Sequence, residues 1–190
     1  MSYAPYQNVT ISFSLPRSRS QWLAWLYRHA IDSWHDPFKN YEHPVQLKYA
    51  IDEWTKIKGD PSAKLFIADT SAILFHDQIV KMLPGAQFIF VIRPVEECMA
   101  SMKRGTGMSF EHLLRPMYSR LVQNSTCRTT LYENIEGFAR RNWGPVTGEA
   151  AAPTDWPSLC ETVVDVPMDR QGGTPERFHK LLKHSEIDFK

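Results

Sequence analysis

Two short segments of the chain combine arginine with serine at places where an anion could bind. The first is Pro16-Arg-Ser-Arg-Ser-Gln-Trp22, which follows an apolar run at residues 9–15 and precedes a helix-like pattern. Guanidinium groups, hydroxyls and the N–H groups at a helix start are common ligands of phosphate and sulfate. The segment therefore predicts an anion site. The alternative is that Ser18 or Ser20 only caps the helix while both arginines are solvated.

The second segment places Arg93 directly after the apolar run 86–92, with Ser101 eight residues later on the helix expected to follow. Arg93 could bind an anion, or it could form a structural ion pair with Glu96 or Glu97. A standard phosphate loop contains a Gly-Lys pair, and the sequence has no such pair. Its absence argues against an ordinary ATP- or GTP-hydrolysing protein.

Together the two segments resemble the two nucleotide-binding motifs of the sulfotransferase family, whose members use 3′-phosphoadenosine-5′-phosphosulfate (PAPS). The resemblance implies that Arg17 contacts the phosphosulfate bridge and that Trp22 stacks on adenine. It also implies that Arg93 and Ser101 grip the 3′-phosphate. The implied cofactor-binding residues are Arg17, Ser18, Arg19, Ser20, Gln21, Trp22, Arg93 and Ser101. Arg19 departs from the family pattern, which has glycine there for close approach to the phosphate.

Sulfonate transfer also needs a base that takes a proton from the acceptor. Arg17 can stabilise charge on the leaving phosphate, but its guanidinium stays protonated and is a poor proton donor. The candidate bases are Asp69, at the end of the strand expected at 64–69, and His35, near the end of the first helix. Histidine has a suitable unperturbed pKa, although a single histidine or aspartate is often only structural. The predicted catalytic set is Arg17, Asp69 and His35, with no metal.

Apolar periodicity predicts the elements that position these residues. Strands are expected at 9–15, 64–69, 86–92 and 161–166, and helices at 21–36, 44–57, 72–83, 95–103, 110–123, 130–143 and 175–183, with a loop at 144–158. Strands that alternate with helices predict an α/β fold, a three-layer α/β/α arrangement around a mostly parallel sheet. The resemblance implies a P-loop-like nucleotide-binding fold. Such sheets bind ligands at the carboxyl ends of their strands.

Composition narrows the expected class and setting. The 190 residues predict a single domain over 1–190, and 22 Lys plus Arg against 21 Asp plus Glu leave a net charge of +1. Bulk charge therefore does not indicate nucleic-acid binding. Three cysteines without close spacing favour a reducing compartment, and no apolar run is long enough to cross a membrane. We expect a cytoplasmic protein.

The leading hypothesis is a PAPS-dependent sulfotransferase acting on an unidentified small-molecule or biopolymer acceptor. The second hypothesis is a kinase-like nucleotide-binding protein that acts on a nucleoside or nucleic acid. In that case Asp69 would be the magnesium ligand. A non-catalytic binding protein that keeps the fold is the third, supported by Arg19 in place of glycine. Fold alone does not separate these functions, because function depends on the site.

Overall fold

A parallel sheet forms the centre of the computed structural model, which describes residues 5–126 and 128–162. The strand order is β2-β3-β1-β4-β5, and all four neighbouring pairs are parallel. The strands are β1 (Val9–Ser14), β2 (Asp32–His35), β3 (Leu65–Asp69), β4 (Gln87–Ile92) and β5 (Thr129–Leu131). The central strand, β1, is buried along its whole length, as expected for a strand covered on both faces.

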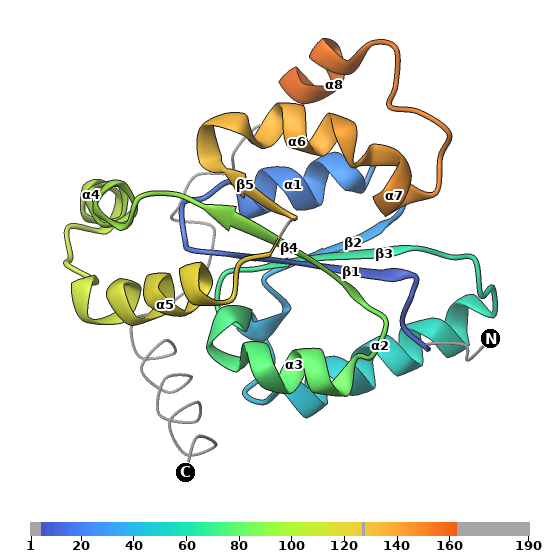
Figure 1. The fold of residues 1–190 in the computed structure, drawn as a ribbon, viewed down its shortest axis with the longest axis horizontal. Coiled ribbons are helices and arrows are strands. Elements are labelled where there is room, and N and C mark those ends of the chain that lie inside the picture. The colour runs from blue at the N-terminus through green and yellow to red at the C-terminus, as the bar shows by residue number, and fades with distance from the viewer. Residues whose placement is uncertain (1–4, 127, 163–190) are drawn as a thin grey trace.

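Helices cover both faces of the sheet (Figure 1). One face carries α1 (Ser20–Tyr27), α6 (Ile135–Arg141), α7 (Trp143–Thr147) and α8 (Trp156–Thr162). The other carries α2 (Pro44–Lys58), α3 (His76–Met82) and α5 (Glu111–Gln123), and α4 (Val95–Thr106) packs against α5. Short 3₁₀ turns lie at Pro37–Lys39, Ala72–Phe75 and Tyr132–Asn134. The predicted three-layer α/β/α class is confirmed.

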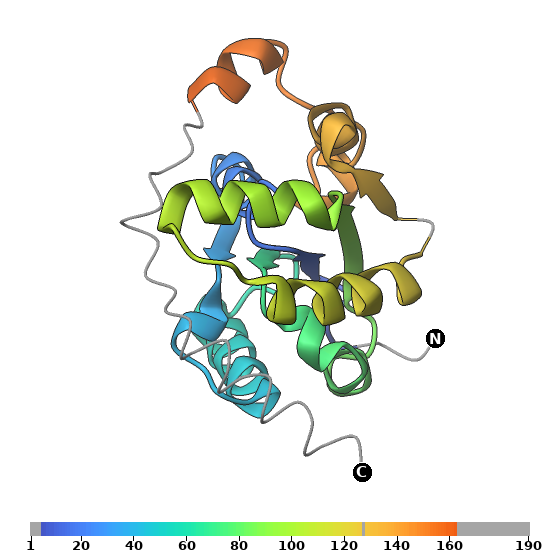
Figure 2. The same ribbon diagram turned by 90° about the vertical axis from the view of Figure 1, so that its left-hand side faces the viewer.

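Alternating side chains of the strands build one apolar cluster on each face. Ile11 and Phe13 of β1 pack in the cluster with α2, α3 and α5, whereas Phe66 of β3 and Val91 of β4 pack under α1 and α6. The strands are thereby held from both sides. Their carboxyl ends face the viewer in Figure 2, with α4 and α5 in front. The sheet is a rigid base for the loops that follow these ends.

Two predicted helices give way to short edge strands. Residues 32–35, expected at the end of the first helix, form β2, because α1 stops at Tyr27 and the following residues pair with β3. Thr130, expected at the start of a helix, lies in β5, which pairs with β4. In both cases pairing with a neighbouring strand outweighs the local helical periodicity.

The C-terminal part differs from the sequence prediction in a second way. The segment 144–158, expected to be a loop, includes most of α7 and the start of α8. Residues 161–162 of the predicted strand 161–166 belong to α8, and the rest of it lies outside the described residues, as does the predicted helix 175–183. Within the described ranges no helix is long and apolar enough to span a membrane.

Candidate functional site

The loop after β1 lies at the middle of the carboxyl edge of the sheet. Since β4 and β3 are the two neighbours of β1, Arg93 follows the strand on one side and Asp69 ends the strand on the other. His35 ends β2, one strand further out. The topology thus brings the predicted site residues to a single edge of the sheet, although they come from distant parts of the sequence. His35 reaches this edge on a strand, not on the predicted helix.

On the β4 side, hydrogen bonds join the two arginines and the serine of the predicted anion site. A terminal guanidinium nitrogen of Arg93 donates to the backbone carbonyl of Arg17, and Arg17 Nε donates to Ser101 Oγ at 3.1 Å. Arg93 Nε also contacts Glu97 Oε2 at 3.1 Å. The alternative ion pair is therefore present together with the contact to the loop. One guanidinium ties the helix-α4 side of the site to the β1 loop.

The backbone of the loop is left-handed at two arginines. Arg17 has φ 69° and Arg19 has φ 58°. For a residue with a Cβ this conformation costs about 1–2 kcal/mol. Arg19 is the N-cap of α1, and no side chain caps this helix start among the described residues. The alternative that Ser18 or Ser20 caps α1 is therefore wrong.

Ser18 lies below the loop against α4. It is wholly buried, and its Oγ lies 3.7 Å from Cys98 Sγ. Burial raises the pKa of the Cys98 thiol, and the hydrogen bond with Ser18 opposes part of that rise. Cys98 therefore remains a neutral packing residue and does not become a thiolate nucleophile.

Tyr132 is a site residue that the sequence analysis did not identify. The guanidinium carbon of Arg93 lies 4.1 Å from the centre of its ring, and that of Arg19 lies 5.5 Å from it. Arg19 also lies 5.6 Å from the ring of Trp22 and forms a 2.9 Å ion pair with Glu136. Tyr132 directly follows β5, which the apolar pattern placed in a helix. A prediction of β5 as a strand beside β4 would have placed Tyr132 at this edge of the sheet.

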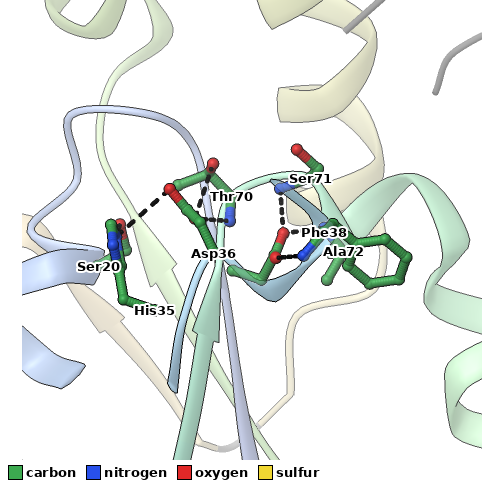
Figure 3. A network of polar contacts seen from close by, with 8 residues as sticks. Ser20, His35, Asp36, Phe38, Thr70, Ser71 and Ala72 are labelled. Atoms are coloured by element: carbon green, nitrogen blue, oxygen red, sulfur yellow. Dashed lines mark hydrogen bonds and ion pairs between the residues drawn. The ribbon is translucent and has the colours of Figure 1, made fainter. Parts of the chain in front are cut away.

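On the β3 side, the Asp69 carboxylate accepts hydrogen bonds from three backbone N–H groups, whose residues are labelled in Figure 3. The donors are Phe38 at 2.9 Å, Ser71 at 2.6 Å and Ala72 at 2.8 Å. Burial and the nearby charge of Asp36 raise the pKa of Asp69, and the three N–H donors oppose the rise. With 1% of its surface exposed, Asp69 joins the turn at residues 37–39 to the end of β3.

His35 contacts the first residue of α1, which directly follows the β1 loop. Its Nε2 is 3.3 Å from Ser20 Oγ and 3.4 Å from Asp36 Oδ2. The other carboxylate oxygen of Asp36 accepts from the backbone N–H and hydroxyl of Thr70, at 3.0 and 3.2 Å. The side chains of His35 and Asp36 are both 16% exposed. The pair therefore connects the first turn of α1 with the end of β3, as Figure 3 shows.

The structure shows no group of three or more His, Cys, Asp or Glu residues that could hold a metal ion in the part of the chain it describes.

Comparison with known proteins identifies the family. No curated protein and no solved structure matches the sequence. A family model described as a sulfotransferase domain matches residues 20–147, a span that begins at the first turn of α1 and includes Arg93 and Ser101. The chain therefore belongs to the sulfotransferase family.

Proposed function

We propose that the protein transfers a sulfonate group from PAPS to a hydroxyl or amine of an acceptor molecule. The observation that carries the proposal is the network of Arg93, Arg17 and Ser101 at adjacent strand ends, in a chain of this family. The network fixes two guanidinium charges beside an uncapped helix start. Preorganised positive charge is what a transfer between anionic groups requires.

In this proposal the donor lies along the cationic side of the edge. Arg93 and Ser101 bind the 3′-phosphate, while Ser20, Gln21 and the first N–H groups of α1 hold the 5′-phosphate. Ser18, which is wholly buried against Cys98, supports the loop. Arg17 lies beside the bridging oxygen and stabilises the charge that develops on the leaving phosphate. It acts by electrostatics and hydrogen bonding, since its guanidinium does not readily release a proton.

We propose His35, in preference to Asp69, as the base. Asp69 is wholly buried and its two oxygens are bound by backbone N–H groups, so we assign it a positioning role. His35 contacts Ser20, a residue of the proposed phosphate site, and histidine is the side chain most often used for proton transfer near neutral pH. Asp36, at 3.4 Å from His35 Nε2, is placed to accept a hydrogen bond from the protonated ring.

The proposed step transfers one proton and one sulfonate group. The proton of the acceptor hydroxyl or amine moves to His35 while the acceptor oxygen or nitrogen forms a bond to sulfur. The bond between sulfur and the bridging oxygen breaks, and its electron pair stays on the phosphate of 3′-phosphoadenosine 5′-phosphate (PAP). Arg17 compensates that charge. The step requires no metal ion.

Calorimetry on the full chain tests the proposal. We expect PAP to bind without a divalent cation and more tightly than ATP with Mg²⁺. Tighter binding of ATP that depends on Mg²⁺ would contradict the proposal and favour the kinase-like alternative. Failure of both nucleotides to bind would also contradict it and favour a non-catalytic protein that keeps the fold.

A further inference from the structure

Arg19 occupies a backbone position that favours glycine, yet its side chain makes several contacts. Its φ of 58° is left-handed. Its guanidinium forms a 2.9 Å ion pair with Glu136 of α6 and lies over the rings of Trp22 and Tyr132, at 5.6 and 5.5 Å. Glycine would relieve the backbone strain but would lose all of these contacts. The contacts therefore give the arginine at this position a specific location above the start of α1.

That location overlaps with the proposed nucleotide site. The family resemblance implies that the adenine ring stacks on Trp22. Trp22 is 4% exposed, and the guanidinium of Arg19 lies over its ring. Glu136 holds the guanidinium of Arg19 there by an ion pair. Glu136 lies on α6, far from the β1 loop in the sequence. A purine that stacks on Trp22 competes with the Arg19 side chain for the space over the ring. The phosphates of the nucleotide compete with Glu136 for the positively charged guanidinium of Arg19.

We propose that Arg19 and Glu136 form a latch over the nucleotide site, which the incoming nucleotide opens. This inference rests on the proposed function. On binding, the ion pair with Glu136 breaks, the purine takes the face of Trp22, and the guanidinium of Arg19 turns to a phosphate oxygen. Glu136 thereby lowers nucleotide affinity, because its ion pair with Arg19 must break before Arg19 can serve the ligand.

The size of the effect follows from exposure. The side chains of Arg19 and Glu136 are 33% and 54% exposed, so the ion pair is screened by solvent and is a weak one. We therefore expect removal of the Glu136 charge to tighten PAP binding by about two- to five-fold. The latch modulates affinity and does not block the site.

The test compares Glu136→Gln with a matched control, Glu133→Gln. Glu133 lines the same surface cavity of about 570 Å³ as Glu136, whereas the 2.9 Å ion pair of Arg19 is with Glu136. Both variants remove one negative charge from the same region. By calorimetry on the full chain, Glu136→Gln should tighten PAP binding about two- to five-fold, whereas Glu133→Gln should change it by less than about 1.5-fold.

A second background isolates the pair. In Arg19→Gly, the addition of Glu136→Gln should have no more effect on PAP affinity than Glu133→Gln has, because the latch is already gone. Equal effects of the two glutamate variants in the wild-type background would overturn the latch while PAP binding by the wild-type chain upholds the proposed function. Absence of PAP binding in the wild-type chain and in every variant would overturn both.

Discussion

The two flanks of β1 carry opposite charge and hold their side chains in different ways. On the β4 side, Arg93 and Arg17 donate to a carbonyl and a hydroxyl, contacts that phosphate oxygens can replace. On the β3 side, Asp69 is wholly buried and bound by three backbone N–H groups. On the β4 flank the arginines can replace their hydrogen bonds within the protein by hydrogen bonds to a ligand. On the β3 flank Asp69 fixes the backbone that positions His35.

The largest expected effect comes from the residue that joins the second flank to the loop. His35→Gln should lower kcat by about 10²- to 10⁴-fold, the usual contribution of a general base. The measurement is the rate of PAP release from PAPS with an acceptor that supports turnover, over a range of pH. PAP affinity should change little, and His29→Gln, in the exposed turn that follows α1, is the control. An unchanged kcat and pH profile would remove His35 from the mechanism.

Asp69→Asn tests whether the buried carboxylate is a positioning group. Asparagine has an NH₂ group in place of one carboxylate oxygen, and this group cannot accept a hydrogen bond from a backbone N–H. At least one buried N–H group loses its acceptor, so the free energy of unfolding should fall by about 1–3 kcal/mol. Urea denaturation monitored by circular dichroism measures this change. Asp77→Asn, at an exposed carboxylate of α3, should change stability by less than about 0.5 kcal/mol. A stable Asp69→Asn protein that has lost turnover would instead make Asp69 the base.

Ser101→Ala should have the smallest effect of the three. It removes the acceptor of the 3.1 Å bond from Arg17 and one proposed ligand of the 3′-phosphate. Loss of one such hydrogen bond corresponds to about a two- to ten-fold weaker affinity for PAP. Calorimetry measures it against Ser119→Ala on the exposed face of α5, which should match the wild type. Equal affinity of both variants would place Ser101 outside the nucleotide site.

The two strand-to-helix junctions that carry Arg17 and Arg93 could be predicted from the sequence. The cationic flank is encoded locally, since Arg93 directly follows the apolar strand β4 and Arg17 closely follows β1, in which apolar and small polar residues alternate. Each strand leads into a helix, so the residues of the junction fall at the sheet edge. The α/β class and the adjacency of the two arginines follow from these two strand-to-helix junctions.

The residues at the ends of the two edge strands could not be predicted in this way. His35 and Tyr132 follow or end short edge strands of four and three residues, whose assignment depends on pairing with β3 and β4. Their local sequence permits a helix, so periodicity placed both in helices. The contact of His35 with Ser20, and that of Tyr132 with Arg93, become visible only when the strand order is known.

The most direct measurement of the central claim compares PAP with adenosine 5′-phosphate, which lacks the 3′-phosphate, by calorimetry on the wild-type chain and on Arg93→Gln. Charge-assisted contacts to the 3′-phosphate predict that the wild-type chain prefers PAP by at least about ten-fold. Arg93→Gln should lose most of that preference while it still binds adenosine 5′-phosphate. Equal affinities of the wild-type chain for the two nucleotides would contradict the account.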